Sequence, residues 1–577
     1  LGDGPRSARI VIVGEAPGQQ EEAQGKPFVG PSGQVLNQML SSCGIARNEV
    51  YVTNVSKTRP PNNDFGAFYE DKSKRVPSQV LKKAIEELEL EIRSIDPHIV
   101  LAMGSEPLRA LTGRMGIDKW RGSLILTGTG HKCLATYHTA FIMRMYHYRI
   151  ICELDIKKMK KHSSTRTIAP LGYELLIDPT LDVVMQKLDY IHTHKLPVSF
   201  DIETVGRHVR CLGFAWNSRR AICIPFTSNK HGPRAGDTTL ILDANENPPG
   251  SHWREEEEHL VVKECKRILE DKDIPKCAQN AVFDMTVLAE EWGIHTQGLD
   301  MDTMLAQHTC YAELGKPAQG DPTKPSASGK KSLDFLCSIW TDTPRYSDYD
   351  AYDDLSTWKY NCMDCCVTFE VWRKLHDELK DLEVDEFYYN HVLPTMWATA
   401  RMQNQGVHID VKLRQEYTVR CERRLEEIQS EIKEVIGTEL NPNSPKQMQE
   451  FLYDSLALPK RYHPVTKRLT SNEEAIEWHR DHSPEHGAIL GRLLEFRGIQ
   501  KLVSNTLRVE LSPGDTLRTT FNVAGTVNGR LASSATIWGE GTNVQNIPAG
   551  RDPEHISYGI RRIVIPPRGY TFIKADL

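Results

Sequence analysis

Two acidic residues lie one position apart in a short apolar stretch, residues 198–204. Asp201 and Glu203 alternate there with apolar residues, a pattern typical of a strand. Because successive side chains of a strand point to opposite faces, both carboxylates face the same side. Two such carboxylates repel each other unless a cation lies between them, and hard divalent cations prefer oxygen ligands. The stretch therefore predicts a metal-binding strand, with a pair of solvated acids on an edge strand as the alternative.

Two later segments add acidic residues at the start of expected helices. Residues 280–284, Asn-Ala-Val-Phe-Asp, follow a short expected strand and place Asp284 in a first helical turn. Residues 360–364 place Tyr360 and Asp364 four positions apart, and therefore on one helix face. Together the three segments supply four carboxylates and a phenol, which suits hydrolysis of a phosphodiester by two metal ions.

In this order the three segments resemble the motifs of the DEDDy proofreading exonucleases, among them the 3′→5′ exonuclease domain of family A DNA polymerases. The resemblance implies that four carboxylates hold two metal ions: Asp201, Glu203, Asp284 and Asp364. It also implies that Tyr360 positions the attacking water, that Asn280 contacts DNA, and that Asp302 supports the site from outside the ligand set. Carboxylate ligands favour Mg²⁺ or Mn²⁺ over Zn²⁺.

Length and composition describe an ordinary globular chain. Its 577 residues suffice for three or four domains, and 39% hydrophobic with 26% charged residues is typical of soluble proteins. No apolar run approaches about 18 residues, so we expect no membrane-spanning helix. The 13 cysteines show no disulfide spacing, which indicates reduced thiols in a cytoplasm. A net charge of −6 does not indicate nucleic acid, although local basic grooves can coexist with it.

The first 140 residues alternate strand-like and helix-like patterns, which predicts an α/β/α layered domain. The expected strands are 8–16, 50–53, 98–104, 124–126 and 134–137, and residues 81–95 form an amphipathic helix. The motifs at the strand ends resemble the uracil-DNA glycosylase superfamily, most closely its family 4: Gly14–Gly18, Pro27–Gly30, Thr53-Asn54, Arg59–Pro61 and Thr136–His138. The resemblance implies a pocket for a flipped-out base.

By this resemblance Phe28 stacks on the base, Asn54 reads its edge and His138 stabilises the departing uracil anion, while Glu15 and Glu21 line the pocket. The chain also departs from the family. Thr139-Ala140 follows His138 where the family has Pro-Ser, and Thr58 stands where a cysteine of its iron–sulfur cluster is expected. We therefore expect no iron–sulfur cluster and weak or no uracil excision, with a non-catalytic packing or DNA-binding module as the alternative.

The last 190 residues resemble the thumb and the start of the palm of family A DNA polymerases. A long amphipathic helix over 413–436 ends at Gly437, and the sharpest matches are 526–534 and 543–548. The resemblance implies that Arg530 and Gln545 contact the primer–template and that Asp576 is the first metal-binding aspartate of the palm. The fingers helix and the second palm aspartate are missing, so we expect a fragment whose longer parent polymerises.

These observations predict an α/β multidomain chain with an RNase H-like exonuclease domain and a largely helical thumb that leads into an α+β palm. The expected domains are a glycosylase-like domain (1–155), a linker (156–170), an exonuclease domain (171–385) and the polymerase part (386–577). A strand at 238–242 and a loop at 311–331 interrupt the exonuclease domain.

The whole chain most resembles DNA polymerases of SPO1-like bacteriophages, which implies a monomer in the cytoplasm of an infected bacterial host. Its partners would be single-stranded 3′ ends and primer–template DNA, with dNTPs bound by the longer parent. Two alternatives remain: a stand-alone nuclease of RNase D type, and a non-catalytic DNA-binding fragment.

Overall fold

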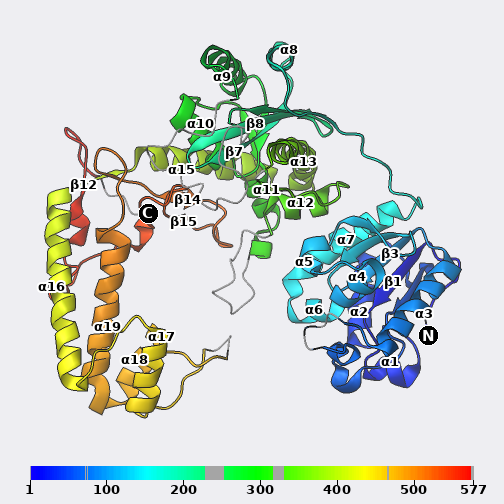
Figure 1. The fold of residues 1–577 in the computed structure, drawn as a ribbon, viewed down its shortest axis with the longest axis horizontal. Coiled ribbons are helices and arrows are strands. Elements are labelled where there is room, and N and C mark those ends of the chain that lie inside the picture. The colour runs from blue at the N-terminus through cyan, green and yellow to red at the C-terminus, as the bar shows by residue number, and fades with distance from the viewer. Residues whose placement is uncertain are drawn as a thin grey trace. The chain divides into compact units, whose positions relative to one another are not determined.

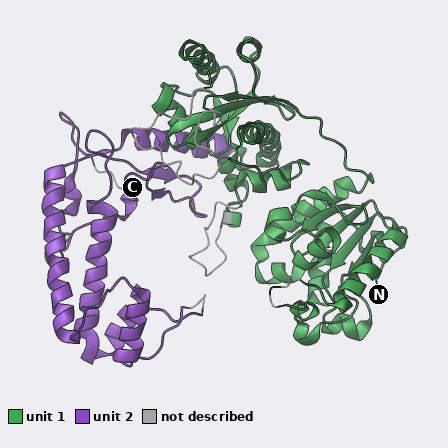
Figure 2. Cartoon of the chain, in the orientation of Figure 1, with its two compact units in different colours: residues 1–314, 328–385 green, residues 315–327, 386–577 purple. Residues whose placement is uncertain are grey.

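The computed structural model describes residues 2–71, 73, 76–227, 252–315, 330–351, 353–463 and 467–573. Asp576, the strand expected at 238–242 and most of the loop expected at 311–331 lie outside these residues. The chain forms two compact units, residues 1–314 with 328–385, and residues 315–327 with 386–577 (Figure 2). Both units mix helices with small sheets, as the predicted α/β class requires (Figure 1).

A five-stranded sheet forms the N-terminal part of the first unit. Its strands lie in the order β2 (Val50–Asn54), β1 (Ile10–Gly14), β3 (Ile99–Met103), β5 (Lys132–Thr136) and β4 (Leu124–Leu126). The first four are parallel, and β4 is antiparallel to β5. Every residue of β1, β2, β3 and β5 is buried, because helices cover a parallel sheet of this kind.

Helices and polar loops surround this sheet. The helices are α1 (Gln19–Gln24), α2 (Pro31–Ser42), α3 (Gln79–Ile95), α4 (Ser105–Thr112), α5 (Ile117–Trp120), α6 (Thr139–Arg144) and α7 (Arg149–His162). The amphipathic helix expected at 81–95 is α3, whose Leu88 and Ile92 share one apolar core with Val11 and Val100 of the sheet.

The segment expected as a linker, residues 156–170, begins as helix. Helix α7 continues to His162, and Ile156 and Met159 are fully buried. The lysine run wrongly indicated a solvated linker. Lys158 is buried, whereas its neighbours Lys157 and Lys160 are exposed. Apolar residues recur here at the helical period between the lysines, and this periodicity outweighs the charge of the run.

A six-stranded sheet forms the second part of the first unit. Its order is β11 (Leu299–Asp302), β10 (Lys276–Ala278), β7 (Val198–Val205), β8 (His208–Asn217), β9 (Arg220–Pro225) and β6 (Glu174–Leu176). Strands β7, β8 and β9 are antiparallel, whereas β10 and β11 run parallel to β7. The strand predicted at 198–204 is thus the third of this sheet.

The helices of this part are α8 (Leu181–Thr193), α9 (Glu255–Leu269), α10 (Ala281–Trp292), α11 (Thr303–Cys310), α12 (Leu333–Trp340) and α13 (Asp354–Asp381). Helix α13 packs on the sheet, with Trp358, Cys362, Cys365 and Cys366 against Cys211 and Cys223. It begins at Asp354 and not at Tyr360, because the Asp353 side chain accepts a hydrogen bond from the Ser356 amide and caps the helix earlier. Tyr360 and Asp364 therefore lie inside a regular helix.

The second unit contains α15 (Leu393–Gln405), α16 (Val411–Ile436), α17 (Pro445–Gln449), α18 (Glu473–His482) and α19 (Gly487–Leu502), with short strands β12 (Val407–Ile409), β13 (Thr516–Leu517), β14 (Thr520–Asn522), β15 (Ala532–Ser534) and β16 (Val564–Ile565). Helices α16 and α19 lie side by side over one apolar core (Figure 1). Gly437 ends α16 with a φ of 79°, as predicted.

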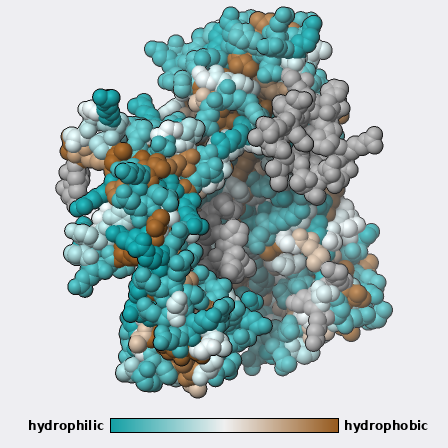
Figure 3. Space-filling view, turned by 60° about the vertical axis from the view of Figure 1, so that its left-hand side comes forward, coloured by the Kyte–Doolittle hydropathy of each residue, from teal (hydrophilic) through white to brown (hydrophobic). Residues whose placement is uncertain are grey.

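The surface drawn in Figure 3 is mostly hydrophilic, with apolar residues gathered in a few patches. Among the described helices, none combines the length and the apolar composition that a membrane crossing requires.

Candidate functional site

Three acidic side chains meet where α13 packs on β7. Oxygen atoms of Asp201, Glu203 and Asp364 all lie within 4.8 Å of one another. Within the described residues this is the one group of three or more acidic, histidine or cysteine side chains that could hold a metal ion. Asp201 and Glu203 are half-buried on one face of β7, and the buried Asp364 comes from α13, 161 residues after Glu203.

Asp284 reaches the same place from α10. Its Oδ1 atom accepts a hydrogen bond of 3.0 Å from the backbone N–H of Ile202, the residue between the two acids of β7. The side chain is buried, with 3% of its surface exposed. The structure therefore brings together the four carboxylates of the three predicted segments.

The electrostatics of these four carboxylates favour a bound cation. Burial, together with the charges of Asp364 and Asp284, raises the pKa of Asp201 above its usual range. Burial raises the pKa of Asp284 to about 8 and that of Glu203 to about 7, the latter despite the opposing charge of Arg210. The four groups cannot all be ionised near neutral pH without a positive charge among them. An all-carboxylate donor set fits divalent metal ions, which exonuclease and polymerase families generally use.

Asn361 supports this cluster and was not singled out from the sequence. Its Nδ2 atom donates to Asp201 Oδ2 at 2.9 Å and to the Asp201 carbonyl oxygen at 3.0 Å. Asn361 is completely buried, so both bonds fix the orientation of Asp201. The signal in the sequence was its position three residues before Asp364, which places both side chains on one helix face.

Three tyrosines gather beside Asp364. Tyr346 donates its hydroxyl to Asp364 Oδ1 at 2.7 Å. The ring of Tyr349 stacks on that of Tyr360, with centroids 4.0 Å apart and planes 14° apart. Burial and the nearby acids, Asp364 first, raise the pKa of Tyr360, so its hydroxyl keeps its proton. The sequence pointed to Tyr360 alone; the repeated tyrosines of residues 346–352 were the missed signal.

Asp302 and Asn280 shape the loop that leads into α10. Asp302 is 1% exposed and accepts hydrogen bonds from four backbone N–H groups, those of Asn280, Ala281, Met304 and Leu305. These bonds hold Asn280 in the left-handed conformation, with φ 60° and ψ 48°, and leave its side chain exposed. Asp302 therefore fixes the backbone that leads into α10, and its support of a catalytic site stays a prediction.

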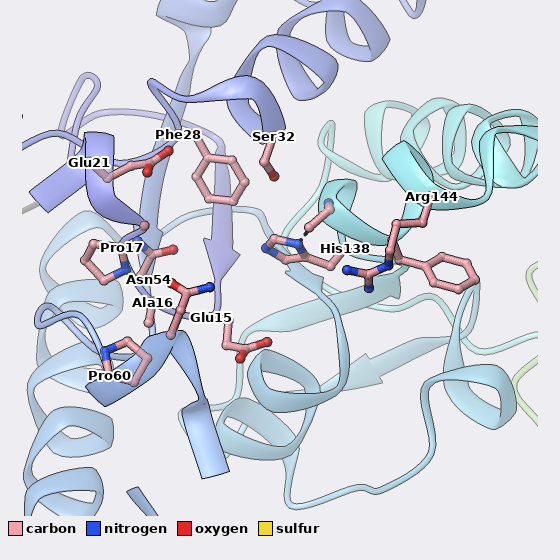
Figure 4. A pocket seen from close by; sticks show the side chains of 14 residues that line it. Glu15, Ala16, Pro17, Glu21, Phe28, Ser32, Asn54, Pro60, His138 and Arg144 are labelled. Atoms are coloured by element: carbon pink, nitrogen blue, oxygen red, sulfur yellow. Dashed lines mark hydrogen bonds between the residues drawn. The ribbon is translucent and has the colours of Figure 1, made fainter. Parts of the chain in front are cut away.

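A second candidate site lies in the N-terminal domain, at the carboxyl ends of β1 and β2. It is a cavity of about 380 Å³. Figure 4 shows Phe28, Asn54 and His138 turned into it, with Glu15, Glu21 and Arg144 around it. All five residues predicted for a uracil pocket therefore line this cavity, and Arg144 is a lining residue that the sequence analysis missed.

The position of Phe28 is set by its backbone. Its φ of 54° is uncommon for a residue with a large side chain. Gly33 permits this, since a Cβ there would lie 1.7 Å from the Phe28 carbonyl oxygen. At Gly14 a Cβ would meet both the Phe28 ring, at 2.6 Å, and Asn54 Oδ1, at 2.4 Å. The two glycines therefore let the aromatic ring and the amide approach each other in the cavity.

His138 is held as a neutral hydrogen-bond donor. Its Nδ1 atom accepts a hydrogen bond of 3.1 Å from the Ala140 N–H, so the proton of the neutral ring lies on Nε2. Burial, and then the charge of Arg144, lower the pKa of His138 to about 4. The ring can thus donate from Nε2 without carrying a charge.

The remaining predicted residues lie in the second unit. Arg530 is exposed in the turn between β14 and β15, and Gln545 is exposed shortly after β15. The Gln545 side chain donates to the Leu531 carbonyl oxygen at 3.0 Å and accepts from Ser533 at 3.1 Å, so the two loops are joined. Asp576 lies outside the described residues.

Comparison with protein families assigns the three parts separately. Residues 1–159 match the uracil DNA glycosylase superfamily, residues 180–380 match a 3′-5′ exonuclease family, and residues 410–577 match DNA polymerase family A. The DNA polymerase of Bacillus phage SP01 is 22% identical over 92% of this chain and 62% of its own length. DNA polymerase I of Synechocystis is 30% identical over 57% of this chain and 32% of its own.

The C-terminal part of the chain, residues 410–577, is therefore similar to DNA polymerase family A. The N-terminal domain belongs to the uracil-DNA glycosylase superfamily: the type-4 uracil-DNA glycosylase of Thermotoga maritima is 36% identical over 28% of this chain and 80% of its own length. The chain spans less than two thirds of the length of the polymerases it matches. The predicted family resemblances are confirmed, and the match over 410–577 argues against a stand-alone nuclease of RNase D type.

Proposed function

We propose that this chain is part of a replicative DNA polymerase that removes nucleotides from single-stranded 3′ ends by hydrolysis. The observation that carries the proposal is the meeting of Asp201, Glu203 and Asp364 within 4.8 Å, with Asp284 bonded to the strand between the first two. Two Mg²⁺ or Mn²⁺ ions bound by these carboxylates would activate a water molecule and stabilise the leaving 3′ oxygen.

In this proposal the chain supplies the geometry of the reaction. Asn361 holds Asp201 through two hydrogen bonds, and Tyr346 holds Asp364 through one. Tyr360, fixed by its stack on Tyr349 and protonated at neutral pH, orients the attacking water. The exposed Asn280 contacts the bound strand.

The test is Mg²⁺-dependent digestion of a 5′-labelled single-stranded oligonucleotide. The double variant Asp201→Ala/Glu203→Ala should lose activity, because two metal ligands are missing, and should keep the thermal unfolding profile. The matched control, Glu255→Ala/Glu256→Ala, removes two exposed carboxylates of α9 and should retain full activity. Tyr360→Phe should slow the reaction without weakening Mn²⁺ binding. Full activity in the Asp201/Glu203 variant would disprove the assignment and leave the non-catalytic, DNA-binding alternative.

The polymerase part is proposed to bind primer–template DNA through Arg530 and Gln545, and the longer parent to extend primers with dNTPs at a metal site that includes Asp576. Arg530→Ala should weaken duplex binding and reduce the slope of log affinity against log salt by about 1, because one phosphate contact is lost. Filter binding at several salt concentrations measures both. An unchanged slope would place Arg530 away from the DNA backbone.

A second function is proposed for the pocket of the N-terminal domain: binding of a flipped-out uracil, with slow excision. The supporting observation is that Phe28, Asn54 and His138 line one cavity and that His138 is set up as an Nε2–H donor. A neutral donor can stabilise the uracil anion that leaves when the glycosidic bond breaks.

The pocket is tested with uracil-containing and thymine-containing DNA. We expect preferential binding of uracil-DNA that Asn54→Ala abolishes, and abasic sites formed far more slowly than by an active type-4 enzyme. Equal affinity for both DNAs would disprove the pocket assignment. Fast excision lost in Asn54→Ala would confirm the pocket and show that Thr139-Ala140 is compatible with full activity.

A further inference from the structure

The glycosylase-like and exonuclease domains of the first unit meet through buried polar contacts. Helix α12 of the exonuclease domain packs against α7 of the glycosylase-like domain. From α7, the buried Lys158 donates its Nζ to the carbonyl oxygens of Ser338, at 3.0 Å, and Thr341, at 2.5 Å. Its third acceptor is the Gly122 carbonyl oxygen, at 2.7 Å. A buried ammonium group needs such acceptors, and two of the three come from the other domain.

A second buried group crosses the same boundary. Arg121 is 1% exposed and pairs with Asp155 at 2.8 Å, while its Nη1 donates to Ser338 Oγ at 3.0 Å. The neighbouring Gly122 has a φ of 72°, and a Cβ there would lie 2.5 Å from the Ser338 carbonyl oxygen. The backbones of the two domains thus approach more closely than any other residue at position 122 would allow.

Ion pairs tie down the segment that follows α12. Asp342 bonds Lys161 at 2.7 Å and His162 at 2.8 Å, both from the end of α7. Burial raises the pKa of the Asp342 carboxyl, but these two partners outweigh burial and hold the pKa below its usual range. Six residues later, Asp348 pairs with Lys119 at 2.9 Å. The segment 342–348 is therefore anchored to the glycosylase-like domain at both ends.

The residues between and just beyond these anchors reach the exonuclease site. Tyr346 lies between them and donates to Asp364 Oδ1 at 2.7 Å. Tyr349, one residue after Asp348, stacks on Tyr360. Tyr346 therefore lies four residues after the anchor Asp342 and two before the anchor Asp348, and Tyr349 directly follows Asp348.

We propose that the glycosylase-like domain positions the exonuclease site, by holding residues 338–348 so that Tyr346 and Tyr349 fix Asp364 and Tyr360. This proposal rests on the exonuclease function proposed above. Lys158 is then a positioning residue that acts through Tyr346. When the anchor is lost the segment can shift, and a displacement of about 1 Å at a reacting centre can cost on the order of 10²-fold in rate.

The test compares two lysines of α7. Lys158→Met keeps the length of the side chain and removes the donors. Lys157→Met makes the same change at an exposed neighbour and serves as the control. On a single-stranded oligonucleotide with Mg²⁺, we expect Lys158→Met to lower kcat by about 10-fold or more, with KM changed less than about twofold. Lys157→Met should behave as the unmodified chain. Unchanged kcat in Lys158→Met would overturn the proposal.

A double-mutant cycle with Tyr346→Phe separates positioning from general destabilisation. If Lys158 acts through Tyr346, the loss in the double variant should equal the larger single loss, whereas independent effects would multiply. Multiplying losses would overturn the proposal. Asp342→Asn is the milder second variant if Lys158→Met does not fold, because its carboxylate is only half-buried. It should give a smaller loss with the same non-additivity.

Failure of the exonuclease function has a different outcome. If the unmodified chain shows no Mg²⁺-dependent digestion, the exonuclease function is disproved. Hydrogen exchange then tests by itself whether Lys158 anchors residues 338–348. Amides of residues 341–350 should exchange faster in Lys158→Met than in Lys157→Met. Equal protection in the two variants would overturn the proposed anchoring.

Discussion

Gly213 provides a sharp test of how α13 and the sheet form the acidic site. It lies on β8 directly opposite Asp201 of β7, beneath α13. A Cβ at this position would lie 2.3 Å from Asn361 Oδ1 and 2.6 Å from Cys365 Sγ. We predict that Gly213→Ala, the addition of one methyl group, displaces α13 and impairs the exonuclease.

The size of the effect follows from the geometry. Since Cβ contacts under 3.0 Å are essentially not seen, the Asn361 oxygen must move by at least about 0.7 Å. Asn361 cannot simply rotate away, because its Nδ2 holds Asp201, and Cys365 is completely buried. Overpacking of this kind costs about 1–3 kcal/mol of unfolding free energy. A shift approaching 1 Å between Asp201 and Asp364 should lower the rate roughly 10- to 100-fold.

The assay is single-turnover digestion of a single-stranded oligonucleotide with Mg²⁺, combined with thermal unfolding. Gly491→Ala is the matched control, because Gly491 lies inside α19 with nothing near its Cβ position. That variant should be neutral or up to about 1 kcal/mol more stable, since alanine favours helix. An exonuclease rate in Gly213→Ala within about twofold of the unmodified chain would refute the argument that this close approach sets the site.

Three further predictions concern single side chains. Asn361→Leu should lower the exonuclease kcat by about 10-fold, because Asp201 loses its fixed orientation, while circular dichroism stays unchanged; undiminished activity would contradict this. Asp302→Ala should cost about 2 kcal/mol or more in urea unfolding, because four backbone N–H groups lose their acceptor, and an equal midpoint would refute it. Burial lowers the pKa of His138 to about 4 in the folded protein, whereas the unfolded chain protonates the ring below about pH 6.5. The stability present above pH 6.5 is therefore lost as pH falls toward 4. The unfolding free energy of His138→Gln should therefore fall less between pH 7 and 4.5, by about 2 kcal/mol; an equal fall would refute it.

Much of the fold was predictable from local patterns. Strand β7, helix α3 and helix α16 with Gly437 at its end follow from side-chain periodicity and from glycine's tolerance of a positive φ, which are properties of neighbouring residues. The two boundary errors had local causes: Asp353 caps α13 ahead of Tyr360, and apolar residues at the helical period carry α7 through the lysine run. The burial of Lys158 within that run does depend on acceptors in another domain, which no local pattern reveals.

The sequence by itself determined which chemistry is available. Acids two residues apart on a strand share a face, and Tyr360 and Asp364 share a helix face. The order of these segments and their resemblance to the DEDDy exonucleases then predicted the exonuclease residues. Only the tertiary structure decided which side chains support them. Asn361, Tyr346 and Tyr349 reach the site because α13 packs within van der Waals contact of Gly213 and because α7 holds the segment after α12. Such contacts depend on distances between residues far apart in the chain, and periodicity carries no information about those distances.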